Sequence, residues 1–323
     1  MGGFFVQGVS IMNDAAFPID PVLTGIVIAY RNQRYIADMV LPRLDPPLAK
    51  KEFKWGKWDL SQGYTIPNTL VGRKGVPTEV EFTGTEESAM CLDYGLDDLV
   101  PYDDEKQAAG SGFAPVRKAA ESLYDLVLLD REKRVADAVF NAATYPTGNK
   151  ATLSGSTQWS HADSDPITAV LTAMDAMLIR PNKMVLGRQV YTKFRTHPKV
   201  VAAVNPSGAA SGVASKEAIA DLLELEDIIV GEAFFNAAKP GQAMSRTRTW
   251  GKHAALIYSD GLADNENGRV TFGFTAQYDT PVSGSIPEPK RGLRGSERVR
   301  SGESVKEVIC APDVGYFFEN AIA

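Results

Sequence analysis

The feature that most constrains the fold is a long uninterrupted segment at residues 114–143. It contains Pro115 near its start and no later proline or glycine, so nothing in it interrupts a helix. Opposite charges lie four residues apart at three places, which supports a helix. We predict a single spine helix of about 45 Å, at 1.5 Å per residue, packed on strands near the C-terminus. Its apolar stripe is formed by Val116, Ala119, Leu123, Leu126, Val127, Val135 and Val139.

An extended β-hairpin loop is predicted at residues 51–95, before this helix. Apolar and polar residues alternate in two runs, one around Phe53 and Trp55 and the other around Val80 and Phe82. Glycines and prolines between the runs indicate a turn. With about 20 residues in each arm at about 3.3 Å per residue, the loop would reach about 60 Å. An isolated two-stranded ribbon is marginally stable in water, so we expect a neighbouring subunit to hold it.

The rest of the chain mixes helices and strands. Prolines divide residues 1–50, which leaves an arm with room for one short helix. Residues 165–262 alternate between helical and strand periodicity, with one helix predicted over 188–204, as in a compact α/β domain. Two closing strands, at 269–281 and 304–318, are separated by a loop rich in glycine and arginine. The fold class is therefore predicted to be α+β.

Composition excludes several classes of function. The 323 residues carry a net charge of -6, which argues against a dedicated nucleic-acid binder. Cys91 and Cys310 belong to no CxxC motif, so we expect free thiols and a reducing compartment. No segment approaches the roughly 20 apolar residues that span a bilayer, and the N-terminus lacks the basic region of a signal peptide. We therefore expect no membrane partner.

The sequence offers no convincing catalytic, cofactor or metal site. His161, His197 and His253 are isolated, and none has a second ligand at metal-binding spacing. His197 precedes Pro198 at a helix end, where a cap or a C-terminal cation is the ordinary role. Residues 103–106 could ligate a hard cation, but a solvated acidic loop is the more common meaning. We predict that the chain is not an enzyme and binds no cofactor.

The order of these elements resembles the major capsid proteins of tailed bacteriophages, those with the HK97 fold. The resemblance covers nearly the whole chain and rests on element order and local patterns. The patterns are "YIADMVLPRL", the acidic "LDDLVPYDDEK", "RPNKMVLGRQVYTKFRTHP", "LLELEDIIVGEAFFNAA", "WGKHAALIYSD" and the closing "GYFFENAIA".

The resemblance implies an HK97-type capsid fold, with a function in self-assembly. It implies pentamers and hexamers of an icosahedral shell that encloses double-stranded viral DNA, bound without sequence specificity. An encapsulin-like compartment shell and, less strongly, an α/β enzyme are the alternatives. The implied regions are an N-terminal arm at 1–50, the extended loop at 51–95, a peripheral domain at 96–159 with the spine helix, an axial domain at 160–262, and returning peripheral strands at 263–323.

The implied partners follow from the same resemblance. Copies of the chain itself come first, in a virion capsid that is assembled in the host cytoplasm. Only about 34 residues precede "YIADMV", and they form no charged helical stretch, so a separate scaffolding protein is expected, together with a portal. A decoration protein is left open. Some members cross-link a loop lysine to a neighbour, but no lysine here aligns with that motif.

Charge and aromatic residues give the candidate contacts between subunits. Residues 86–105 hold eight acidic side chains and no basic one, whereas residues 290–300 hold five basic side chains and one acidic one. We predict that these two stretches pair across subunits; the alternative is that they face solvent or packaged DNA. The candidate contact residues are Trp55, Lys57, Trp58, Arg73, Lys74, Asp97, Asp98, Asp103, Asp104, Arg291, Arg294 and Arg298.

Overall fold

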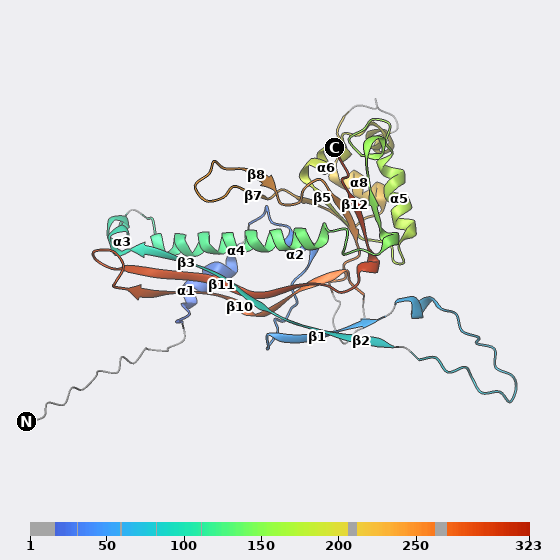
Figure 1. Ribbon diagram of the computed structural model, residues 1–323, viewed down its shortest axis with the longest axis horizontal. Helices are drawn as coiled ribbons and strands as arrows, with labels where there is room; N and C mark the ends of the chain where they lie inside the picture. Colours follow the sequence, from blue (N-terminus) through green and yellow to red (C-terminus); the bar gives the residue numbers. More distant parts are fainter. Residues whose placement is uncertain are drawn as a thin grey trace, which may run out of the picture. The chain divides into compact units, whose positions relative to one another are not determined.

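A computed structural model describes residues 17–30, 32–58, 60–81, 83–110, 112–205, 212–261 and 270–323 (Figure 1). The chain forms two compact units. Unit 1 contains the described residues up to 30 together with 95–124 and 281–302, and unit 2 contains 31–94, 125–280 and 303–323. The division into arm, extended loop, peripheral domain and axial domain stays a prediction. Four elements contribute residues to both units: β3 (Leu92–Pro101), α4 (Pro115–Val139), β10 (Gly273–Glu288) and β11 (Ser296–Ile309).

The predicted spine helix is present as α4, a single helix of 25 residues. It ends at Val139 rather than at residue 143, because side chains beyond it bond its last carbonyls. The Tyr145 hydroxyl donates to the carbonyl oxygen of Val139 at 2.8 Å, and the Thr144 hydroxyl donates to that of Ala138 at 2.8 Å. The three predicted ion pairs along the helix form: Arg117–Glu121, Asp130–Arg134 and Lys133–Asp137.

Unit 1 has a small apolar core around the N-terminal half of α4. Helix α1 (Pro21–Ala29) packs into this core, and the carboxylate of Asp20 caps it by accepting from the Val22 and Leu23 amides at 2.7 and 3.3 Å. The helix thus begins where the cap and Pro21 place it. The buried side chains of this core are Leu23, Val100, Ala119, Ala120, Leu123 and Val299.

The apolar stripe of α4 is narrower than predicted. Leu123 and Val127, four residues apart, are both buried, but Leu126 is 52% exposed. The prediction that Leu126 packs on the late strands is therefore wrong. Residues at i and i+4 align on one side of a helix, and Leu126 falls to the side of that line. Val135 is buried, as predicted, in the core of unit 2.

Unit 2 is built on a five-stranded mixed sheet. Its order is β4 (Lys150–Thr152), β12 (Gly315–Glu319), β9 (Ala254–Ile257), β5 (Lys183–Gly187) and β6 (Asp227–Gly231). β4 and β12 pair parallel, as do β5 and β6, whereas β9 runs antiparallel to both of its neighbours. The closing strand β12 therefore completes a sheet whose other strands lie earlier in the chain.

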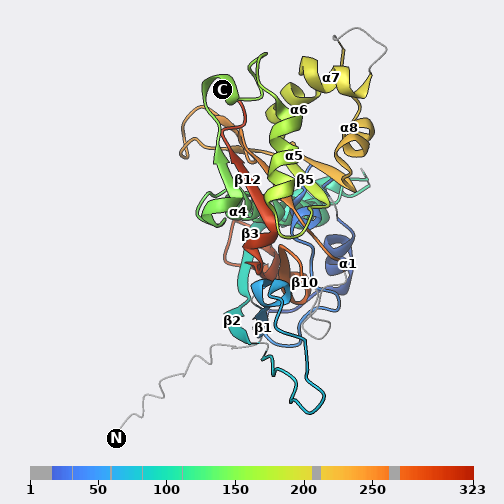
Figure 2. The same ribbon diagram turned by 90° about the vertical axis from the view of Figure 1, so that its right-hand side faces the viewer.

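Alternate residues of this sheet enter two different cores. Met184 and Leu186 of β5 pack under the helices on one face, and Val185 between them packs on the opposite face with Val139 of α4. Figure 2 shows the helices gathered beside the sheet. They are α5 (Pro166–Ala176), α6 (Arg188–Arg195), α7 (Pro198–Val204) and α8 (Lys216–Leu223).

The single helix predicted over residues 188–204 is in fact two helices. Pro198 has no amide hydrogen and begins a new helix, α7. The Nδ1 atom of His197 accepts from the Lys199 amide at 3.3 Å, so His197 caps the start of α7. Of the two roles expected of this histidine, a cap or a C-terminal cation at the end of a helix, the structure shows a cap, at the start of α7.

The extended hairpin is present, but its paired part is short. β1 (Glu52–Trp58) and β2 (Gly84–Met90) pair antiparallel with Glu52 opposite Met90 and Trp58 opposite Gly84. A strand was expected around Val80, but the described residues there form none. Phe82 lies outside the described residues. The expectation of about 20 paired residues in each arm is therefore wrong. The remaining short elements are α2 (Ala37–Val40), α3 (Tyr102–Ala108), β7 (Phe234–Asn236), β8 (Arg246–Arg248) and four turns of 3-10 helix at Leu60–Tyr64, Thr147–Asn149, Gly155–Thr157 and Pro312–Val314.

Candidate assembly interface

The segment between β1 and β2 exposes large apolar side chains. Ile66, Leu70 and Val76 are 91%, 86% and 85% exposed. Its backbone makes a tight turn in which the amide of Gly75 donates to the carbonyl oxygen of Gly72 at 2.8 Å. No side chain of residues 62–81 belongs to the apolar cores of either unit. This surface is therefore available to another chain.

The base of the hairpin is anchored to its own chain by aromatic side chains. Trp55 is 8% exposed and lies with its ring centroid 5.7 Å from Phe53 and 6.4 Å from Phe274 of β10. Trp55 was expected to contact a neighbouring subunit, and its packing within its own chain was not predicted. The side chain of Trp58 is outside the described part of the chain. Contacts of either tryptophan with a neighbouring subunit stay a prediction.

Cross-strand ion pairs support the two hairpin strands. The Lys54 ammonium lies 3.0 Å from Glu86, and that of Lys57 lies 3.2 Å from Glu87. These pairs are exposed, so each contributes at most about 1 kcal/mol. They help to explain why the glutamate-rich segment 84–90, rather than the apolar run before it, forms the second strand.

The acidic and basic stretches meet within one chain, in unit 1. The Asp97 carboxylate accepts from Arg300 at 2.7 and 2.8 Å and lies 3.3 Å from Arg298. The hydrogen bond from Arg300 is the main reason why the pKa of Asp97 is lowered. Asp103 pairs with Arg294 at 3.0 Å. This arrangement differs from the expected pairing across subunits, and contacts of these residues with a neighbour stay a prediction.

The other candidate contact residues are exposed. Arg73 and Lys74 lie on the tight turn of the extended loop, and Asp104 and Arg291 are exposed in unit 1. The carboxylate of Asp98 accepts from the Leu99 amide next to it at 2.8 Å. Sequence reasoning missed Leu293, which is 97% exposed between β10 and β11. An apolar residue between glycines and arginines indicates an exposed loop, and this pattern could have identified Leu293.

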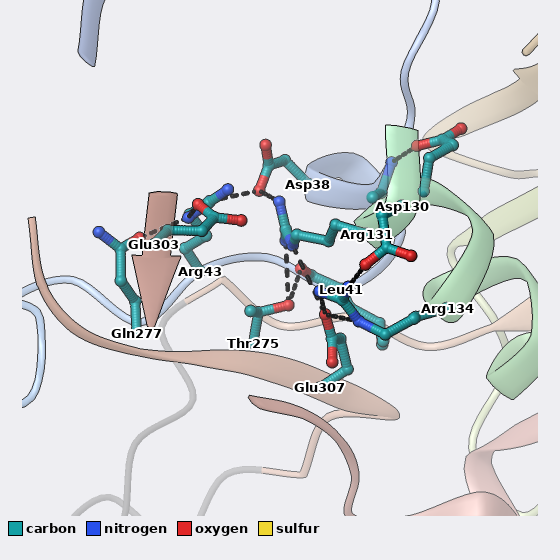
Figure 3. A network of polar contacts seen from close by, with 12 residues as sticks. Asp38, Leu41, Arg43, Asp130, Arg131, Arg134, Thr275, Gln277, Glu303 and Glu307 are labelled. Carbon is teal, nitrogen blue, oxygen red and sulfur yellow. Dashed lines mark hydrogen bonds and ion pairs between the residues drawn. The ribbon is translucent and has the colours of Figure 1, made fainter. Parts of the chain in front are cut away.

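A polar network in unit 2 holds residues 36–43 against α4 (Figure 3). Arg131 of α4 is almost fully buried and donates to Asp38 at 2.6 Å and to the hydroxyl of Thr275 at 3.1 Å. Arg43 donates to the same carboxylate at 2.9 Å and to Glu303 at 2.7 Å. Burial alone would raise the pKa of Asp38, but the two guanidinium groups outweigh it and lower the pKa.

Glu132, the next residue of α4, is completely buried and receives only N–H donors. Its carboxylate accepts from the Ile36 amide at 3.0 and 2.9 Å, the Ala37 amide at 2.8 Å and the Trp250 indole at 2.5 Å. Burial is the main reason why the pKa of Glu132 is raised. Glu132 thereby satisfies the first amides of α2, which have no partner within the helix. No local signal in the sequence indicates this contact, because its partners are 95 or more residues away.

The structure also bears on metal sites, membrane-spanning helices and disulfides. Among the described residues, no three His, Cys, Asp or Glu side chains lie close enough to hold a metal ion. Within the same residues, no helix has the length and apolar character needed to cross a bilayer. Cys91 and Cys310 are free thiols, as predicted.

Comparisons with known proteins agree on one class. A family model described as "Phage major capsid protein E" matches residues 129–300. The chain is 52% identical to the major capsid protein of Pseudomonas phage JBD67 over 97% of its own length and 100% of the relative. It is 26% identical to the major capsid protein of Burkholderia phage BcepMu over 92% of its length and 95% of that protein.

Solved structures are similar over nearly the whole chain. A phage-related protein from Bordetella bronchiseptica superposes with a TM-score of 0.73 at 23% identity, covering 95% of this chain and 99% of that one. A chain of the capsid of cyanophage P-SCSP1u gives a TM-score of 0.56 at 10% identity, covering 98% and 92%. Since both identities are low, these likenesses bear on the fold alone.

Proposed function

Because this chain belongs to the family of phage major capsid proteins, we propose that it assembles as pentamers and hexamers into an icosahedral shell around double-stranded DNA. Its fold is the HK97-type α+β capsid fold that the sequence predicted. The relatives are named as structural proteins of the capsid, in agreement with the prediction that the chain is not an enzyme. A place in the virion capsid follows from the family.

The exposed apolar loop is the observation that carries the proposed mode of assembly. Covering one large aliphatic side chain stabilises a contact by about 1.5–3 kcal/mol, so Ile66, Leu70 and Val76 together offer roughly 5–9 kcal/mol. A loop of one subunit that lies on the body of the next forms a heterologous contact, and such contacts close into rings when the rotation allows it. Rings of five and six subunits then tile a shell.

The partners of the shell are part of the same proposal. A separate scaffolding protein and a portal are expected to act with it in the host cytoplasm, and a decoration protein is left open. An encapsulin-like compartment is the competing function. Particles purified from infected cells distinguish the two, since a virion shell protects double-stranded DNA from nuclease and a compartment shell holds protein cargo instead.

The assembly proposal is tested by placing charges on the loop. Leu70→Asp with Val76→Asp introduces two carboxylates at exposed apolar positions, and Asn68→Asp with Thr69→Asp introduces the same charge at polar positions of the same loop. Because only the first pair removes apolar surface, we expect it to leave small oligomers while the second still forms capsomers or shells. Size-exclusion chromatography and electron microscopy measure the outcome.

Two results would contradict this mode of assembly. Shells that form equally well from both variants would show that the loop's apolar side chains are not needed. A monomer from the unaltered chain, under every condition that assembles its relatives, would refute the shell function itself.

A further inference from the structure

β7 and β8 form a short hairpin (Figure 1), and different side chains lie on its two faces. Phe234 lies opposite Arg248, and Phe235 lies opposite Thr247, so the two pairs point to opposite sides of the ribbon. The Lys133 ammonium of α4 lies 5.4 Å from the centre of the Phe235 ring. One face is therefore turned toward α4, and the face that carries Phe234 is turned away from it.

Two guanidinium groups are held on the face that points away from α4. The Phe234 ring lies 4.3 Å from the guanidinium carbon of Arg248 and 5.0 Å from that of Arg246. A guanidinium stacked on a ring keeps the N–H donors at its edge free and loses less side-chain freedom when it binds an anion. The arrangement pre-orients two cations side by side.

The hairpin and the residues that flank it in the sequence carry basic side chains and no acidic one. Residues 233–259 contain no aspartate or glutamate, and they contain Lys239, Arg246, Arg248 and Lys252. In the part of the chain that the structure describes, none of these four cations forms an ion pair. Most arginines of the two units do have a carboxylate partner, as at Arg298 and Arg300. In a chain of net charge -6, this is a local surplus of positive charge.

We propose that the Phe234 face of the β7–β8 hairpin contacts the phosphates of the enclosed double-stranded DNA, an inference that rests on the proposed shell function. Arg246 and Arg248 are two residues apart on one strand, so their attachment points lie about 6.7 Å apart. That spacing suits successive phosphates along one DNA strand. Guanidinium groups bind phosphate through paired N–H donors and read no sequence when they do so, which suits DNA of any sequence.

The test measures DNA binding by full-length, unassembled protein as a function of salt. The probe is a fluorescently labelled random-sequence duplex, and the salt range is about 50–200 mM, over which phosphate contacts weaken strongly. The hairpin variant is Arg246→Gln with Arg248→Gln. The matched control is Lys50→Gln with Lys118→Gln, which removes two exposed charges at positions that are assigned to no interface. Thermal unfolding of each variant verifies that it is folded.

Each lost phosphate contact lowers the slope of log affinity against log salt by about 0.9, so the hairpin variant should lose about 1.8 and the control nothing. Shells of the hairpin variant should still form. Equal losses in both variants would overturn the proposal, because net charge alone would then explain the binding. If the hairpin variant binds DNA normally but no longer assembles, the proposal is also overturned. The Phe234 face would then contact an acidic surface of a second copy of the chain. Failure of the unaltered chain to form shells would instead contradict the proposed function.

Discussion

Replacing Glu132 with glutamine should destabilise unit 2, because one buried N–H group would lose its hydrogen-bond acceptor. Three N–H groups point at this carboxylate, from Ile36, Ala37 and the indole of Trp250. A glutamine offers one oxygen in place of two. If the glutamine oxygen takes the Oε1 position, its NH2 group faces the Ala37 amide. If the oxygen takes the Oε2 position, the NH2 group faces the indole N–H of Trp250. In either orientation one buried donor has no acceptor, at a cost of about 1–3 kcal/mol.

The measurement is equilibrium urea unfolding of the unassembled subunit, with a double-mutant cycle. Trp250→Phe removes the indole donor, so in that background the glutamine oxygen can serve both backbone amides. The cost of Glu132→Gln should therefore fall by about 1–3 kcal/mol in the Trp250→Phe background. Glu121→Gln on the same helix breaks only the ion pair with Arg117 and should cost about 0.5 kcal/mol or less. An unfolding midpoint that Glu132→Gln leaves unchanged, or the same cost in both backgrounds, would refute the reasoning.

Two further predictions concern α4 and unit 1. Leu123→Ala removes a buried side chain and should lower the free energy of unfolding by about 2–5 kcal/mol, whereas Leu126→Ala, at a position that is 52% exposed, should change it by about 0.5 kcal/mol or less; equal losses in urea unfolding would show that the helix face is misassigned. Because the hydrogen bond from Arg300 lowers the pKa of Asp97, its carboxylate stabilises the folded chain above about pH 4, and this contribution is lost as the pH falls through the lowered pKa. Asp97→Asn should therefore be less stable than the unaltered chain at neutral pH and equally stable in strong acid; a difference in thermal unfolding that persists in strong acid would contradict the ion pair.

The elements that local sequence determines were predicted well. The spine helix follows from Pro115 and the absence of later breakers, and its ion pairs follow from the i,i+4 spacing. Its true end was not predictable, because it depends on the Tyr145 hydroxyl that bonds the Val139 carbonyl after the chain has turned back. The exposure of Leu126 was not predicted. The sequence shows which residues of a helix are apolar, but it does not show how much of the helix surface the neighbouring elements cover.

Features that depend on distant partners were predicted poorly. The second hairpin strand contains Glu86 and Glu87, which carry no strand signal of their own and form ion pairs with Lys54 and Lys57 diagonally across the two strands. The burial of Trp55 depends on Phe274, which is more than 200 residues away. Apart from the two tryptophans, the candidate contact residues were chosen by charge, and charge alone does not distinguish a partner in the same chain from one in a neighbour.

The exposed loop between β1 and β2 also bears on the fate of subunits before assembly. Exposed loop tips are preferred sites of proteolytic cleavage, and no side chain of residues 62–81 of this loop is part of an apolar core. If a neighbour covers it in the shell, only free subunits are open to host proteases there. Capture by a neighbour is bimolecular and speeds up with subunit concentration, whereas the chance that a given free subunit is cut does not depend on how many others are present. With that mode of assembly, survival of the protein would require synthesis fast enough that capture outpaces degradation.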